Sequence, residues 1–310
     1  MEKNEYNTRA IEIDNTTSIS HLFDKVRQNF CSERFRLFAK IDIVRFYEIS
    51  CAKTSYAFGG VCVFLLCAIL SLPLGENSIS AVFFGDNLRK VPIYSVDTTE
   101  KKVAISFDAA WGADKTEKIM DILEEYQVNA TFFLVGFWAD KYADIVREID
   151  KRGFEIGTHS NTHPDLSKLS SEQVKLELTQ SIEKINSACS GVSVKLFRPP
   201  FGAYNNTVID VADSIGLKTI QWNVDSLDWK GGSGAEICER IMGKVKNGSI
   251  ILCHNNADHI LEALPLVLDR LKMQNYSVVS VGELIYLDNY TIDRAGVQHK
   301  VEGTGEKDEF

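Results

Sequence analysis

The chain has 310 residues, of which 45% are hydrophobic and 25% are charged. This composition is that of an ordinary globular protein, so it excludes a wholly disordered chain, and the length suits one α/β barrel with an appendage. The net charge of −9 argues against a nucleic-acid partner, because phosphate binding needs a concentrated basic face.

The first 53 residues carry nearly balanced charge and several aromatic residues. Apolar residues within 23–49 often stand three or four positions apart, which is typical of an amphipathic helix. We expect residues 1–53 to form a cytoplasmic segment that can lie on the inner membrane surface. We assign no chemistry to it.

Residues 54–75 contain no charged residue. About 20 residues at roughly 1.5 Å each cover the roughly 30 Å of hydrocarbon in a bilayer. A buried helix of a soluble domain is the alternative, but this run has no polar face and lies between charged segments. The run therefore predicts a single transmembrane helix that anchors the chain in membrane lipid.

The charged flanks of this run predict its orientation. Cytoplasmic flanks carry an excess of Lys and Arg, so we expect the N-terminus inside and everything from residue 76 onward outside the cell membrane. A cleaved signal peptide is the alternative, since a small-x-small sequence precedes Ala81, although the apolar run begins late for one. The charges are Arg34, Arg36, Lys40, Arg45 and Lys53 before the run, and Glu76 and Asp86 after it.

Beyond a linker at 76–100, short apolar runs alternate with longer amphipathic ones. Seven such units over 101–285 predict a distorted (β/α)7-type barrel, with a polar C-terminal tail at 286–310. An open doubly wound sheet is the alternative. No GxGxxG or GxxxxGK follows the first strand, so a nucleotide ligand loses its usual support. Strands are expected at 102–107, 130–136, 154–159, 195–200, 218–223, 249–254 and 276–281, and helices at 114–126, 139–152, 171–188, 205–215, 235–246 and 258–273.

The seven cysteines do not form the pattern of a disulfide framework. Four lie in or before the apolar run, and the three that follow it, Cys189, Cys238 and Cys253, have no CxxC spacing. Each of these three stands in an apolar context. We expect them to be small buried hydrophobic residues.

Polar residues stand at or just beyond the ends of five predicted strands. In a parallel barrel the carboxyl ends of the strands form one face, which is where active sites are built. The sequence therefore predicts a functional site on this face. Its candidate residues are Asp108, His159, Arg198, Asp225 and His254.

His159 and His163 stand four residues apart in HSNTH. In a helical turn or tight loop both imidazoles can reach one cation, as paired zinc ligands do. Two exposed loop histidines are the alternative for this spacing. The polar residues expected on the same face favour the metal site.

The other candidates suggest acid–base chemistry. Asp108 ends an apolar strand, where it could also cap the next helix. Arg198 precedes two prolines that stiffen the backbone, and its guanidinium could hold a carboxylate or form an ordinary surface pair. His254 could donate a proton near neutral pH, or it could be a core histidine. Asp225 is the candidate to orient His254, and Asp228 is its rival.

Five segments together resemble the polysaccharide deacetylase (NodB-homology) family of carbohydrate esterases. In chain order they are SFDAAWG, HSNTH, RPPFG, DSLDW and ILCH, and the resemblance covers about 100–285. They are similar to the family's TFDDG, HSxxH, RPPxG, DxxDW and LxH motifs. WGADKT, QWNVDSLDWK and the N-terminal anchor look like the sporulation-associated subgroup often called PdaB.

The resemblance implies an acid and a base. Asp108 would be the general base that activates water, and Arg198 would orient it. His254 would protonate the leaving amine, and Asp225 would orient His254.

The resemblance also implies a metal site and a substrate pocket. His159 and His163 would bind a divalent metal, usually zinc in the family. The backbone N–H of Phe201 would stabilise the tetrahedral oxyanion. Trp229 and Leu252 would line the pocket for the acetyl methyl group.

The sequence departs from the family pattern at Ala109, where the family has a second aspartate as the third metal ligand. Alanine cannot coordinate a cation, so two imidazoles remain and neither brings a negative charge. Asp114, at the start of the next helix, is the candidate replacement. The substitution therefore puts the metal dependence of this protein in question.

The resemblance therefore predicts an enzyme, a hydrolase that removes N-acetyl groups from peptidoglycan amino sugars outside the membrane, in sporulation or cell-wall remodelling. One alternative is a catalytically impaired wall-binding or morphogenetic protein, which Ala109 favours. Retention of Asp108, Arg198 and His254 argues against it. Another alternative is a deacetylase of a different polysaccharide, such as chitin.

Overall fold

The computed structural model describes residues 89–301. These residues belong to the second of two units of the chain, Asn87–Phe310. The segment 1–53, the transmembrane helix predicted at 54–75 and the charges that flank it lie outside the described residues. Within 89–301, none of the helices has the length and apolar character needed to cross a membrane.

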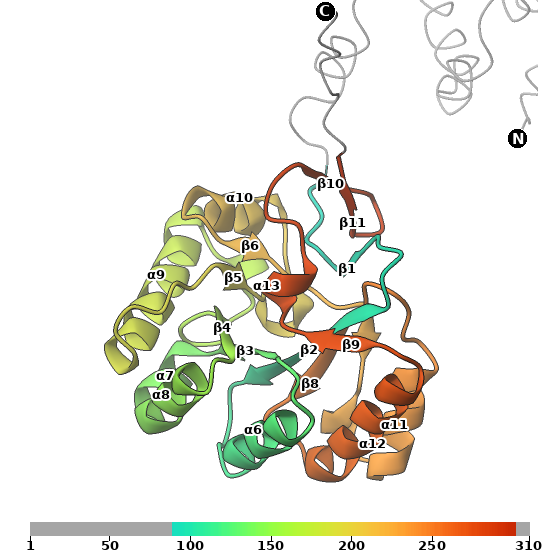
Figure 1. The fold of residues 1–310 in the computed structure, drawn as a ribbon. Coiled ribbons are helices and arrows are strands. Elements are labelled where there is room, and N and C mark those ends of the chain that lie inside the picture. The colour runs from blue at the N-terminus through green and yellow to red at the C-terminus, as the bar shows by residue number, and fades with distance from the viewer. Residues whose placement is uncertain (1–88, 302–310) are drawn as a thin grey trace, which may run out of the picture. The chain divides into compact units, whose positions relative to one another are not determined.

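The core of the domain is a sheet of eight parallel strands that curves into a half-barrel (Figure 1). The parallel α/β architecture that we expected is confirmed as a half-barrel, and its sheet has eight strands where seven were predicted. Seven strands follow the order β6-β5-β4-β3-β2-β8-β7, and β9 pairs with the start of β2. The strands are β2 (Lys102–Ala109), β3 (Thr131–Leu134), β4 (Glu155–Thr158), β5 (Leu196–Phe197), β6 (Lys218–Thr219), β7 (Val224–Asp225), β8 (Ile250–His254) and β9 (Ser277–Val279).

Helices surround the strands, as Figure 1 shows, because the strands are apolar on their outward faces. Along β2, the side chains of Val103, Ile105, Phe107 and Ala109 join one buried cluster with residues of the helices. Ser106 and Asp108 alternate with them. The helices are α6 (Thr116–Glu125), α7 (Gly136–Lys141), α8 (Ala143–Lys151), α9 (Ser171–Ala188), α10 (Asn206–Ser214), α11 (Gly234–Met242), α12 (Ile260–Met273) and α13 (Val281–Leu284).

Capping boxes fix where α9 and α11 begin. Ser170 accepts the backbone N–H of Gln173, whose side chain in turn accepts the N–H of Ser170, before α9. Ser233 and Glu236 repeat this arrangement before α11. Each box satisfies N–H groups that have no partner inside the helix. Short 3₁₀ turns occupy Leu166–Lys168, Pro200–Gly202 and Asp228–Lys230.

A second, three-stranded sheet joins the two ends of the domain. It contains β1 (Ser95–Val96), β11 (Val297–Lys300) and β10 (Tyr290–Ile292), in that order. The strand β1 lies in the expected linker, and β10 and β11 lie in the expected polar tail. These segments therefore carry regular structure packed against the barrel, since single bridges join Ile93 to Ile220 and Ser95 to Ser249.

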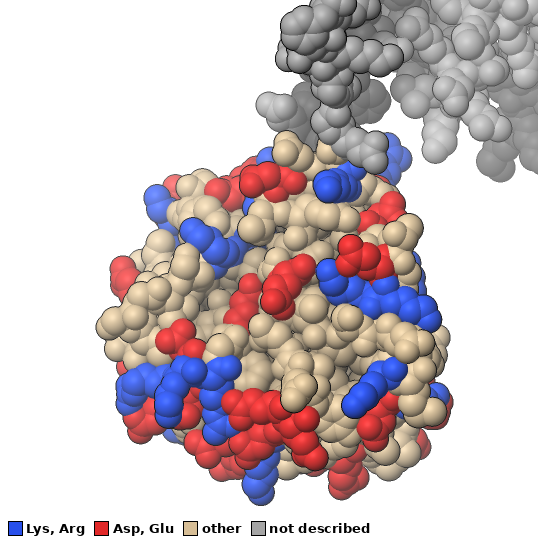
Figure 2. Space-filling model, in the orientation of Figure 1, with Lys and Arg blue, Asp and Glu red and all other residues tan. Residues whose placement is uncertain are grey.

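Other differences from the predicted elements are local. The strand β7 has only two residues and was not predicted. The helix expected at 139–152 begins earlier, at Gly136, and is divided at Tyr142 into α7 and α8. The three cysteines of the domain are buried and free, as expected. On the face drawn in Figure 2, acidic and basic side chains are interspersed among uncharged ones.

Candidate active site

A buried ion pair stands at the carboxyl end of β2. Nη1 of Arg198 lies 2.7 Å from Oδ1 of Asp108, and both side chains are buried. Burial raises the pKa of Asp108, but the charge of Arg198, with smaller contributions from His159 and His254, outweighs burial and holds this pKa below its usual value. Asp108 is therefore a carboxylate at neutral pH, and the expected contact with Arg198 is present.

His254 stands beside Asp108, because parallel strands β2 and β8 place these two residues in register. Nδ1 of His254 lies 2.7 Å from Oδ1 of Asp228, and the backbone N–H of His254 donates to Oδ2 of the same carboxylate. Burial lowers the pKa of His254, but the hydrogen bond and charge of Asp228 outweigh it and raise this pKa. His254 is thus suited to hold a proton near neutral pH.

The contact with Asp228 corrects the assignment of Asp225 as the partner of His254. Asp225 lies in β7 beside Leu252, and its carboxylate accepts the backbone N–H of Leu227. Leu227 has a left-handed backbone (φ 52°), and this turn brings Asp228 back to His254. The two aspartates of DSLDW therefore differ in role, and Asp228, named as the rival, holds the imidazole.

His159 and His163 come together as predicted, with ring centroids 4.9 Å apart. Their segment is a loop in which Ser160 and His163 have positive φ, 70° and 60°. Nδ1 of His159 donates to the carbonyl oxygen of Arg198 at 2.7 Å, since a carbonyl can only accept. Nε2 of His159 therefore carries a lone pair, and it lies 3.5 Å from Oδ2 of Asp108.

Both imidazoles are neutral at neutral pH. Burial lowers the pKa of His159. Burial, followed by the charge of His159, lowers the pKa of His163 to about 4. A neutral imidazole with one nitrogen tied to a carbonyl is the form that ligates metals.

These donors match two of the three protein ligands that a catalytic zinc usually takes. The third position does not fit. Ala109 is fully buried, and its side chain belongs to the apolar cluster that contains Phe107 and Trp138. Among residues 89–301, no group of three or more His, Cys, Asp and Glu is placed to hold a metal ion.

The predicted substrate contacts remain predictions. Phe201 has a left-handed backbone (φ 59°) in the turn that follows Arg198, and its ring is exposed. Leu252 is buried in β8. Trp229 is exposed, and Nζ of Lys230 lies 4.9 Å from its ring centroid.

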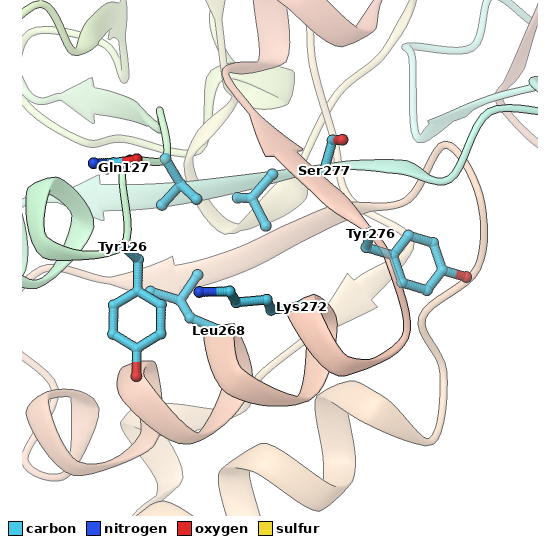
Figure 3. A pocket seen from close by; sticks show the side chains of 8 residues that line it. Tyr126, Gln127, Leu268, Lys272, Tyr276 and Ser277 are labelled. Carbon is cyan, nitrogen blue, oxygen red and sulfur yellow. The ribbon is translucent and has the colours of Figure 1, made fainter.

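A hollow of about 250 Å³ lies elsewhere in the domain (Figure 3). It is lined by the end of α6, the last turns of α12 and the start of β9, with Tyr126, Lys272 and Tyr276 among its residues. Ser277, also in its wall, pairs with Lys102 at the amino end of β2. The hollow is therefore at the opposite end of the sheet from Asp108 and His254.

Comparison with known proteins agrees with this geometry. The polysaccharide deacetylase family profile matches residues 95–220. The uncharacterized protein YlxY of Bacillus subtilis is 36% identical over 200 residues, which cover 64% of this chain and 62% of that protein. The chain thus spans less than two thirds of that curated relative. A peptidoglycan-N-acetylglucosamine deacetylase of Bacillus cereus is 32% identical and covers 62% of this chain and 70% of its own length.

Solved structures show the same relationship. A CE4 family pseudoenzyme from Bacillus anthracis aligns with a TM-score of 0.61 and 32% identity, covering 70% of this chain and 75% of that one. A mutant of that protein with restored enzymatic activity aligns with the same TM-score and 35% identity, covering 66% and 73% of the two chains. With the ordered motifs, the half-barrel and these relatives, the chain belongs to the polysaccharide deacetylase family.

Proposed function

We propose that this chain is an active deacetylase that removes N-acetyl groups from the amino sugars of peptidoglycan. The observation that carries the proposal is the register of β2 and β8, which sets Asp108 beside His254. Each of these side chains has a buried partner of opposite charge: Asp108 pairs with Arg198, and His254 pairs with Asp228. Two titratable groups whose pKa values are pushed apart are the usual mark of an acid–base pair.

The reaction follows from these placements. Asp108 uses Oδ1 for Arg198, and its carboxylate accepts a proton from water as the oxygen of that water attacks the acetamide carbonyl carbon. The backbone N–H of Phe201 donates to the oxyanion that forms. His254 gives its proton to the nitrogen as the C–N bond breaks. The products are acetate and a free amino sugar.

The substrate class rests on the relatives. The Bacillus cereus relative is a peptidoglycan-N-acetylglucosamine deacetylase, and a relative in Rhizobium leguminosarum is a chitooligosaccharide deacetylase. We favour peptidoglycan because the predicted anchor at 54–75 would hold the domain against the wall outside the cell membrane. A role in sporulation or wall remodelling, as in the PdaB-like subgroup, is part of the same proposal.

The acid and base assignments are tested by Asp108→Asn and His254→Ala in the full-length chain. Each variant is expected to remain folded and to lose at least about 10²-fold in rate, since positioned proton transfer contributes about that much. The measurement is mass spectrometry of muropeptides and chito-oligomers after incubation with the protein. Met273→Ala, an exposed change on α12, is the control. Near-normal deacetylation by both site variants would remove the mechanism.

The role of Asp228 predicts a pH effect. A general acid must be protonated, so activity is lost as pH rises through the pKa of His254. Asp228→Asn removes the charge that raises this pKa, so the alkaline limb of the kcat/KM profile should move to lower pH. Asp225→Asn is the matched comparison and should give a smaller shift, because Asp225 bonds the backbone of Leu227 and raises the pKa of His254 by its charge alone. An equal shift in both variants would contradict the assignment.

The metal remains a separate proposal. We infer that zinc binds weakly through His159 and His163, because Ala109 removes one ligand and one compensating charge. Ala109→Asp should bind zinc more tightly than wild type in a calorimetric titration, and Ala110→Asp, one position along, should not. Equal, tight binding by wild type and Ala109→Asp would mean that another group, Asp114 first, supplies the third ligand. Absence of binding by both would mean that HSNTH is not a metal site.

A second candidate function is a wall-binding protein without turnover. Ala109 in the apolar cluster favours it, and so does the similarity to a pseudoenzyme. Incubating wild-type protein with muropeptides, with and without zinc, separates the two functions. Acetate release supports the deacetylase. Binding to the glycan with no acetate under either condition supports the second candidate.

The location is tested with intact protoplasts. Added protease should digest the domain after residue 76 and leave the N-terminal segment 1–53 protected, if the charges before residue 54 keep that segment inside. Immunoblots against each end of the chain report the result. A soluble form that begins at Ala81 would show that the predicted anchor is cleaved.

A further inference from the structure

In the part of the chain that the structure describes, all exposed Trp and Phe rings lie on the catalytic face. Within residues 89–301 the exposed Trp and Phe side chains are Trp111, Phe201 and Trp229, and their exposed fractions are 64%, 70% and 60%. They follow β2, β5 and β7, at the carboxyl ends of the strands. The other large hydrophobic residues exposed in this part of the chain are aliphatic. A cluster of large, solvent-exposed apolar side chains indicates a binding surface.

Two side chains from other parts of the domain hold the loop that carries Trp111. The carbonyl oxygen of Gly112 accepts two hydrogen bonds, from Nε1 of Trp138 at 2.7 Å and from Nδ2 of Asn255 at 3.0 Å. Gly112 has φ +67°, and a Cβ there would lie 2.2 Å from Nδ2 of Asn256. The buried side chains of Trp138 and Asn255 thus hold Gly112 in place. They fix the backbone next to Trp111, whose ring is mostly exposed to solvent.

Trp111 and Phe201 both contact one imidazole, that of His163. The ring centroids of Trp111 and Phe201 lie 4.8 and 4.6 Å from that of His163, both edge-on. The two aromatic rings are therefore no farther apart than the sum of these distances. Phe201 keeps its left-handed backbone although its ring gains little burial, and strain of this kind is concentrated at functional sites.

We propose that Trp111 and Phe201 form a platform on which the sugar rings of an N-acetylated glycan stack beside the reacting unit. The inference rests on the proposed function and names an oligomer of amino sugars, not a single sugar, as its substrate. A pyranose ring presents C–H groups on its face and hydroxyls on its rim, so it matches an aromatic face bordered by water.

Binding is measured by calorimetry on the full-length chain, with Asp108→Asn present throughout so that the ligand is not consumed. The probes are N-acetylglucosamine and its β-1,4-linked tetramer. Trp111→Ala should weaken tetramer binding by about tenfold or more, as loss of a rigid aromatic anchor does. Trp111→Phe, which keeps a ring, should recover most of the affinity. Leu287→Ala, an exposed change away from the site motifs, should have no effect.

Phe201→Ala is the second variant, since Trp111→Ala alone could disturb its loop. It should also weaken tetramer binding, while Trp111→Ala should leave the weak binding of the monomer unchanged. Unchanged tetramer affinity in both alanine variants would overturn the platform, and so would no tetramer binding by the parent. If the parent binds the tetramer through these rings but wild-type protein releases no acetate, the platform stands and the proposed activity fails.

Discussion

The buried guanidinium of Arg198 holds the catalytic face together. Its Nη1 donates to Asp108 near the end of β2, and its Nη2 donates to the carbonyl oxygen of Gln221 beyond β6. The backbone carbonyl of Arg198 accepts a hydrogen bond from His159, which follows β4. The side chain also lies over the ring of Phe133, 4.1 Å from the centroid. A buried charge that loses its partner costs about 3–5 kcal/mol, so these strand ends cannot separate cheaply.

The site has two zones of opposite electrostatic effect, one around the positive charge of Arg198 and one around the negative charge of Asp228. The charge of Arg198 keeps Asp108 ionised, while burial keeps His159 neutral. At the end of the neighbouring strand β8, the carboxylate of Asp228 raises the pKa of His254 and so favours the charged form of this imidazole. A base and an acid can therefore coexist on neighbouring strands at one pH. Ala109, which follows Asp108 at the end of β2, adds no charge to either zone.

The sequence was sufficient for features that depend on local pattern. The apolar runs of β2, β3 and β8 predicted buried parallel strands, and the polar residues after them predicted the catalytic face. It assigned Asp225 instead of Asp228 as the partner of His254, because the position of Asp228 depends on the left-handed turn at Leu227. It also missed the short β7 and the strands in the linker and tail, whose partners are distant in the chain and whose composition is polar.

The pairing of β1 with β11 has a consequence for how the protein is made. Ser95 stands opposite Val297, and the ring of His299 contacts Asp97, so the first strand of the domain has partners near its last residues. Such non-local contacts form late, because the intervening loop must close first. During synthesis, β1 must wait until nearly the whole domain has left the ribosome. The three-stranded sheet can therefore form only after β11 (Val297–Lys300) has been synthesised.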